Sequence, residues 1–557
     1  SNIPNANQLE LVPYILAGGS DVLNTELGID SRYVLTSNSV MKVTFNPDFG
    51  QVEADPSVLN LTAFETFYDE KRPFFSEGSD FFSQRINLFN SRRIGRKPNF
   101  YIPDEGEITG LSNYTTILGA TKIMGSTPSN INYGIIGAIT KEESATIDDS
   151  LTAQKIIIEP RTNYSIGRFE LPVFNVISKI GIMGTNVSRK DAADASVIGG
   201  DWDLSFLDNR LFSNGQIIRS NVNNTIGNAF RFNLGYLNSD WWSARIWLGT
   251  SDDKFDINDL GFVRRNDITW AGSRIELRKQ EPWGRFINNN LEFKYTQDWN
   301  RSGLALEREV EIEQSNLFSN YWRAGFFGKL FLPAFNDDDI FRSENAWIYK
   351  TELWGYAGPS ISTDRRKKII IGTDIGTGYG EKRGRGYRVS SWLKAKPVEQ
   401  LNIEINVVQD KSPSYMQWVD LIEDINDTVR VYAKSVLFTR DMNIRLDWTF
   451  TPRLTLQCYM QPFYADMDYQ RFFRLNRPKT MDLDLYDYEK VSGYENPDFR
   501  LFNTVGTFVL RWEYQPGSTL YVVYNLNQSS DFSFSESNWN LNTENAVYFK
   551  LNYWFKS

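Results

Sequence analysis

Several acidic and amide side chains lie close together between residues 252 and 259, and their types are those that bind calcium. Carboxylate and amide oxygens at alternating positions of a loop are the hard ligands that Ca²⁺ prefers. The stretch lacks the spacing and the terminal glutamate of an EF-hand, so a solvated or internally hydrogen-bonded loop is the alternative interpretation. The candidate calcium ligands are Asp252, Asp253, Asp256, Asn258 and Asp259.

Two further stretches have the composition of a phosphate-binding site. Residues 376–386 contain Gly-Tyr-Gly and Gly-Arg-Gly, but they lack the Lys-Ser/Thr ending and the strand-to-helix setting of a phosphate loop. A glycine-rich turn is the better interpretation. Residues 365–368 read Arg-Arg-Lys-Lys. At a strand end they either meet lipopolysaccharide phosphates at the outer rim or are solvated.

The residues needed for common hydrolytic chemistry are missing. The chain contains no histidine and only one cysteine, Cys458. This composition excludes a Ser-His-Asp triad, a histidine-ligated zinc and an internal disulfide. Carboxylates are abundant, with 69 Asp and Glu residues, so the choice of any two for glycoside hydrolysis would be arbitrary. We therefore expect no catalytic site, no enzyme activity and no cofactor.

The composition is typical of one large unit rather than several domains. The 557 residues show no linker, no low-complexity tract and no block of like charge, so we expect a single domain over residues 1–557. Aromatic residues make up 15% of the chain, yet no apolar run is long enough for a membrane-spanning helix. The net charge of −9 argues against nucleic acid as a partner.

The last strand-like segment, residues 546–555, has an apolar face and a polar face. In an outer-membrane barrel the apolar face meets lipid, the polar face meets a wet lumen, and aromatic side chains lie at the headgroups. A soluble sandwich shows the same alternation with its apolar face turned into a core. We expect this segment to close a barrel by pairing near Leu9, with an outer face formed by Val547, Phe549, Leu551, Tyr553 and Phe555.

The same alternation recurs along most of the chain, and this recurrence favours the membrane barrel. In residues 444–450 and 507–526, for example, Leu, Phe, Trp and Tyr hold one face while charged and polar residues share the other. The pattern predicts an all-β, transmembrane antiparallel β-barrel of about 24–26 strands in the bacterial outer membrane. Short turns such as 451–453 should be periplasmic, and long polar loops, above all 465–502, should be extracellular.

Residues 46–78 break this alternation and carry aromatic side chains among charges of both signs. The spacing of Phe64, Phe67 and Tyr68 predicts one short amphipathic helix. Because a lumen tolerates charge and lipid does not, we expect the segment to fold inward and bind the barrel wall. Its expected contact residues are Asp48, Phe49, Glu53, Asp55, Phe64, Glu65, Glu70, Lys71, Arg72, Phe74 and Phe75.

The chain also resembles a known family through several short motifs. The motifs are residues 45–55 (Phe-Asn-Pro-Asp-Phe-Gly-Gln-Val-Glu-Ala-Asp), 60–61, 64–65, 70–75 (Glu-Lys-Arg-Pro-Phe-Phe), 91–95, 255–262 and 552–555. They are similar to a Bacteroidota outer-membrane β-barrel family of unknown function. Its members usually carry an N-terminal family-9-type carbohydrate-binding module, which this sequence does not show. The resemblance implies a barrel and assigns carbohydrate binding to the missing module.

Three functions fit these observations. The first is a channel or transport protein whose lumen is constricted by the segment 46–78. The second is a non-catalytic structural or assembly subunit of a larger outer-membrane complex, and the third is a surface glycan-related protein. The expected partners are outer-membrane lipid and lipopolysaccharide, together with outer-membrane lipoproteins or other barrel subunits if the second function applies.

Overall fold

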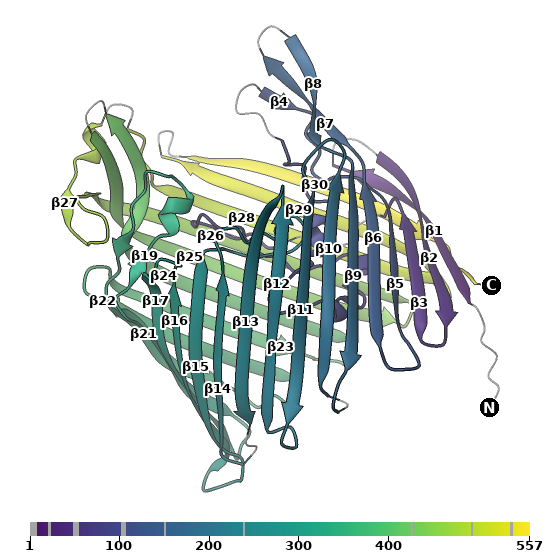
Figure 1. Cartoon of the computed structure of the whole chain (residues 1–557), viewed down its shortest axis with the longest axis horizontal. Coiled ribbons are helices and arrows are strands. Elements are labelled where there is room, and N and C mark those ends of the chain that lie inside the picture. Colours follow the sequence, from purple (N-terminus) through teal and green to yellow (C-terminus); the bar gives the residue numbers. More distant parts are fainter. Residues whose placement is uncertain are drawn as a thin grey trace.

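A single antiparallel β-sheet closes on itself in the computed structural model of this chain (Figure 1). The structure describes residues 8–20, 24–47, 55–101, 107–149, 152–175, 177–237, 240–424, 427–491, 494–534 and 538–556. Within these ranges, 24 strands form the wall of the barrel. The predicted all-β membrane barrel is therefore confirmed, and its strand number lies within the expected range.

The wall strands follow one another around the barrel in chain order. They are β1 (Leu9–Gly19), β2 (Asn24–Thr36), β3 (Ser39–Phe45), β5 (Ile117–Ser126), β6 (Asn132–Thr140), β9 (Thr162–Pro172), β10 (Lys179–Arg189), β11 (Ala195–Phe206), β12 (Leu211–Val222), β13 (Thr225–Leu237), β14 (Trp242–Ser251), β15 (Ile268–Lys279), β16 (Phe286–Trp299), β17 (Ala305–Phe318), β18 (Arg323–Phe331), β21 (Trp354–Ser362), β22 (Ile369–Gly380), β23 (Gly384–Ala395), β24 (Leu401–Asp424), β25 (Asp427–Thr451), β26 (Leu454–Leu475), β28 (Phe499–Gln515), β29 (Ser518–Ser533) and β30 (Asn538–Asn552).

The remaining elements are short. Strands β27 (Leu483–Leu485) and β31 (Phe555–Lys556) extend the main sheet, and β19 (Phe335–Asn336) pairs with β20 (Tyr349–Lys350). A separate sheet contains β4 (Glu107–Thr109), β7 (Glu143–Asp149) and β8 (Thr152–Glu159). The helices are α1 (Pro73–Ser76) and the 3-10 turns η1 (Ser79–Phe81), η2 (Ser91–Arg93), η3 (Asp338–Phe341) and η4 (Tyr488–Lys490). None of the helices within the described ranges has the length and apolar character needed to cross a membrane.

The first and last wall strands pair with each other and close the sheet. In this pairing Tyr14 is opposite Asn552 and Gly19 is opposite Val547, while Leu11 of β1 is opposite Phe555 of β31. Closure gives every wall strand two neighbours, so no row of unpaired peptide groups faces lipid.

The two faces of the wall differ sharply in exposure. Ile217 is 61% exposed and its neighbour Ile218 is 1% exposed, and Phe549 is 51% exposed beside Lys550 at 4%. Because successive side chains of a strand point to opposite faces, the exposed aliphatic and aromatic rows form one continuous outer surface. This surface is the lipid-facing side of an outer-membrane barrel.

The strand directions define two ends of the barrel. We call the end that carries the turns at 452–453 and 516–517 the turn end, and the opposite end the loop end. Residues 365–368 connect β21 to β22 at the turn end, together with those short turns. Of the two alternatives for this cation cluster, its position favours a solvated strand end over the outer rim, because the loop end is the extracellular one in such barrels.

The structure differs from the sequence prediction in two stretches, because polar residues obscure the strand pattern in both. Residues 465–502 were expected to form one long loop, but β26 continues to Leu475 and β28 begins at Phe499. The polar parts of these strands extend beyond the membrane, where the backbone hydrogen bonds between neighbouring strands continue in water. Strands β7 and β8 were not predicted, and they project beyond the loop end (Figure 1).

The outward position of Phe549 leads to a first prediction. Replacing Phe549 with Arg should destabilise the folded barrel by about 2–4 kcal/mol, because an Arg facing the middle of the bilayer is costly. Ala546 lies on the inward face of the same strand, so Ala546→Arg should cost far less. Urea titration of the protein refolded in lipid vesicles measures both, and equal losses would contradict the assigned facing.

Candidate functional site

One connection between wall strands packs against the inner face of the barrel. It leaves β3 and returns to β5, both at the loop end, and we call its described part, residues 55–101, the inner segment. In Figure 1 this segment lies between the near and the far wall. It buries Phe75, Phe82, Leu88, Phe89 and Ile94 against inward side chains that include Ile136, Ile166, Met183 and Ile218. Apolar burial therefore holds one side of the inner segment to β5–β13.

The inner segment contains less helix than its sequence spacing suggests. Residues 60–72 are all described and contain no helix, so the helix predicted through Phe64 and Phe67 is wrong. The two rings pack against different elements, because Phe64 contacts Phe341 at a centroid distance of 5.3 Å and Phe67 contacts Phe262 at 5.0 Å. The only α-helix, among described residues, is the single turn α1, which begins at Pro73.

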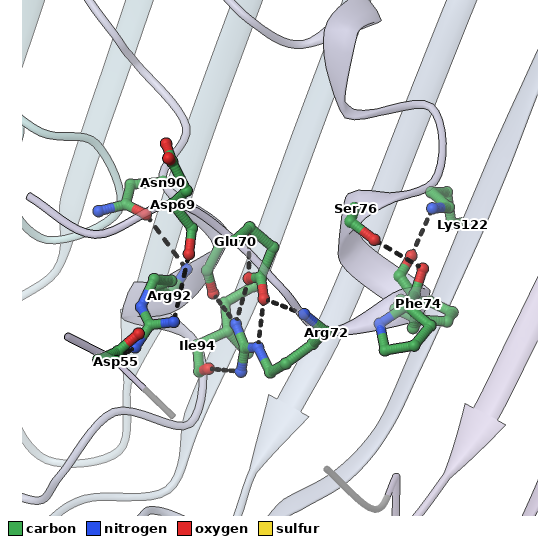
Figure 2. Close-up of polar contacts among 12 residues, drawn as sticks. Asp55, Asp69, Glu70, Arg72, Phe74, Ser76, Asn90, Arg92, Ile94 and Lys122 are labelled. Carbon is green, nitrogen blue, oxygen red and sulfur yellow. Dashed lines mark hydrogen bonds and ion pairs between the residues drawn. The ribbon is translucent and has the colours of Figure 1, made fainter. Parts of the chain in front are cut away.

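Buried ion pairs and hydrogen bonds connect different parts of the inner segment to one another, as Figure 2 shows. The Arg72 guanidinium donates to both carboxylate oxygens of Glu70 at 2.9 and 2.7 Å and to the carbonyl oxygens of Ser91 and Ile94 at 2.6 and 2.7 Å. Burial raises the pKa of Glu70, but the hydrogen bonds and charge of Arg72 and the Ser91 hydroxyl outweigh it, and the net pKa is lowered. Glu70 is therefore held as a carboxylate.

A second arginine connects the inner segment to another loop. The Arg93 guanidinium donates to the two carboxylate oxygens of Glu65 at 2.8 and 2.7 Å and to the Gly261 carbonyl oxygen at 3.2 Å. The backbone N–H of Asn90 donates to the carbonyl oxygen of Leu260 at 2.7 Å. Residues 255–262 thus pack on residues 87–93, and three stretches that carry the family resemblance meet in one place.

The candidate calcium ligands lie in the loop that makes these contacts. Asp252 Oδ2 accepts from the backbone N–H of Asn228 at 2.8 Å, and Asp256 Oδ1 accepts from that of Asn258 at 2.8 Å. Asp259 forms an ion pair with Arg189. In the part of the chain that the structure describes, no three carboxylate, cysteine or histidine side chains gather as a metal site. The calcium site stays a prediction, and this geometry does not support it.

The inner segment is also bonded to the wall beside it. Lys122 of β5 donates from its ammonium group to the carbonyl oxygen of Phe74, as Figure 2 shows. It also donates to the carbonyl oxygen of Glu77 at 2.5 Å. Lys42 of β3 forms an ion pair with the Glu77 carboxylate. Burial raises the pKa of Glu77, but the hydrogen bond and charge of Lys42 outweigh it, and the net pKa is lowered.

Two glutamines connect the inner segment to opposite sides of the barrel. The side chain of Gln216 on β12 accepts from the backbone N–H of Ile86 at 2.7 Å. Gln461 on β26, which is 2% exposed, accepts from the N–H of Ser57 at 2.7 Å and donates to its carbonyl oxygen at 3.3 Å. In the pairing order of the 24 wall strands, β12 and β26 lie twelve strands apart in either direction.

The sequence pattern identified only part of this arrangement. Of the expected contact residues, Asp55 pairs with Arg92 and Lys71 lies over the Tyr459 ring at 5.9 Å. Asp48, Phe49 and Glu53 fall outside the described residues. The wall partners Lys122, Gln216 and Gln461 were missed, because period-2 alternation shows which side chains point inward but not which of them meet the inner segment.

Comparison with known proteins gives a family and several distant structures. A family described as a domain of unknown function, DUF5916, matches residues 7–554. No curated protein matches the chain. Among solved structures, a ferric enterobactin receptor mutant from Pseudomonas aeruginosa in complex with enterobactin is 8% identical, with 99% of this chain and 82% of that chain covered and a TM-score of 0.39.

Two other solved structures are similar at the same level. The siderophore receptor PirA from Acinetobacter baumannii is 7% identical, with 100% and 81% covered and a TM-score of 0.40. The unliganded ferric citrate transporter FecA is 6% identical, with 100% and 79% covered and a TM-score of 0.35. The family match extends over nearly the whole barrel, from the start of β1 to the end of β30. This chain therefore belongs to the DUF5916 family.

Proposed function

We propose that this barrel is a transport or channel protein of the outer membrane whose lumen is narrowed by the inner segment. The observation that carries the proposal is the pair of contacts at Gln216 and Gln461, on strands at opposite sides of the ring. A segment bonded to both sides crosses the lumen. A barrel of about two dozen strands is otherwise wide enough to leave an aqueous channel or to need a plug.

The part of the wall that lies outside the apolar core has charged inward side chains, and these favour a water-filled passage. Inward side chains of β15–β18 form a ladder of ion pairs, in which Lys294 contacts Glu311 at 3.2 Å and Lys329 contacts Glu309 at 2.9 Å. Arg274 pairs with Glu292 on the same face. Charged side chains of this density require water or a polar solute beside them. We propose that solute passes along this charged face once the inner segment moves.

A second candidate function is a scaffold for other outer-membrane proteins. The sheet of β4, β7 and β8 projects beyond the loop end (Figure 1) and offers a surface to a lipoprotein or another barrel subunit. We propose that the barrel, if it serves as a scaffold, has no enzyme activity. A Bacteroidota source and a role on surface glycans are further proposals that rest on the motif resemblance alone.

The transport proposal predicts the effect of releasing the inner segment from β26. Gln461→Ala removes the two hydrogen bonds to Ser57, worth about 1 kcal/mol each, so the detached state should be populated roughly thirtyfold more often. Single-channel recording in planar bilayers should show more frequent and larger openings. Gln457→Ala, on the same inward face of β26, provides the matched control. Identical traces for both variants and the unmodified protein would contradict the proposed constriction.

A second prediction concerns Arg93, which bonds to Glu65 within the inner segment and to Gly261 of the loop between β14 and β15. Arg93→Ala removes the bidentate contact with Glu65 and the hydrogen bond to Gly261, so local opening of the inner segment at these residues should become easier by about 2 kcal/mol, or roughly thirtyfold. Limited trypsin proteolysis measures this, because cleavage after Lys71 requires that the segment leave its packed position. Arg93→Lys should restore part of the protection. Unchanged cleavage rates in Arg93→Ala would show that this contact does not hold the segment.

A further inference from the structure

The outer surface of the barrel carries a large groove near the loop end. The groove has a volume of about 1480 Å³ and runs across β17, β18, β21 and β22. Its sides are outward-facing residues of the wall, among them Val310, Leu330 and Tyr379. Because these side chains belong to the lipid-facing rows, the groove opens to the bilayer along the wall, while the inward-facing Lys329 and Tyr356 also contribute to its lining.

Small residues create the groove. In the pairing of β18 with β21, Leu330 is opposite Gly355 and Gly328 is opposite Ala357. Gly328, Gly355 and Ala357 all line the groove, and they leave a hollow between larger neighbours on either side. An acyl chain lying in this hollow would contact protein on several sides, whereas a convex wall offers only one. The shape therefore fits a lipid that stays in place.

Cations surround the loop end of the groove. Lys350, Lys382, Arg385 and Lys479 all line it. The backbone N–H of Lys350 donates to the Thr480 carbonyl oxygen at 3.0 Å, and that of Lys479 donates to the Ile348 carbonyl oxygen at 2.6 Å. These two bonds join strand β20 to the loop after β26, and so bring cations distant in sequence together.

The acidic residues at the groove do not neutralise these cations. Glu352 is already engaged, because its carboxylate accepts from Arg383 Nε at 3.2 Å and from the backbone N–H of Lys382 at 2.7 Å. Glu381 is the other acid in the lining. Lys329, which also lines the groove, is paired with Glu309 on the inner face. The rim therefore carries an excess of positive charge.

We propose that this groove binds a phosphorylated, multiply acylated lipid of the outer leaflet, with lipid A as the chemical type. The acyl chains lie over Gly328, Gly355 and Ala357, and the phosphates meet Lys350, Arg385 and Lys479. Lysine and arginine near a membrane surface attract anionic headgroups, and the loop end is the side that faces the outer leaflet. The site is on the outside of the wall, so it does not depend on the proposed transport function.

The test compares charge removal at the two ends of the barrel. Lipid A is titrated into the purified full chain in detergent, and native mass spectrometry gives the fraction of protein that carries it. The triple variant Lys350→Gln, Arg385→Gln, Lys479→Gln should bind lipid A roughly a hundredfold more weakly. The control triple variant Arg365→Gln, Lys367→Gln, Lys368→Gln removes the same charge at the turn end and should bind normally. Equal losses in both triples would overturn the proposal.

A second pair of variants tests the apolar part. Ala357→Phe fills the groove and should reduce lipid A binding about tenfold, whereas Ala271→Phe places the same ring on the outer face of β15 and should not. Dephosphorylated lipid A should bind the unmodified protein as weakly as lipid A binds the loop-end triple. Heat-dependent gel mobility shows that each variant is folded. Undiminished lipid A binding by Ala357→Phe, or equal binding of the two lipids, would overturn the proposed site.

Discussion

A peptide group inside a bilayer has no water to bond to, and this constraint determines the rest of the structure. It requires that β1 pair with β30, so the sheet closes with Tyr14 opposite Asn552. Closure with 24 strands in turn makes a lumen too wide for wall side chains to fill. The inner segment occupies part of that space, and its apolar core with β5–β13 is a consequence of the barrel's width.

The interior is divided chemically between two parts of the wall. On β5–β13 a patch of inward aliphatic residues packs against Phe75, Phe82 and Leu88, beside a buried ion pair of Arg168 with Asp201. On β15–β18 they are charged and paired, as Lys329 is with Glu309. An apolar face can hold a segment by excluding water, and a charged face requires water. The same wall thus anchors the inner segment on one side and leaves a hydrated surface on the other.

Besides its apolar packing on the wall, the inner segment is held by buried arginines and by hydrogen bonds to its backbone. Arg72 and Arg93 each donate hydrogen bonds to a carboxylate and to backbone carbonyl oxygens. These bonds give partners to carbonyl groups of a segment that has almost no helix of its own. Gln216 and Gln461 bond to the backbone of Ile86 and Ser57. Neutral amide contacts are weaker than charged ones. The contact of Ser57 with Gln461 is therefore easier to release than the part of the segment that packs on β5–β13.

The sequence alone determined the all-β fold, the outward rows such as Phe549 and the inward position of Lys550, because period-2 alternation is a local property of each strand. It also indicated that residues 46–78 differ from the wall. Only the tertiary structure decided which residues meet that segment, because Lys122, Gln216 and Gln461 are distant in sequence and become neighbours only when the ring closes. The cation-rimmed groove had no sequence signal, since its residues come from separate strands and loops.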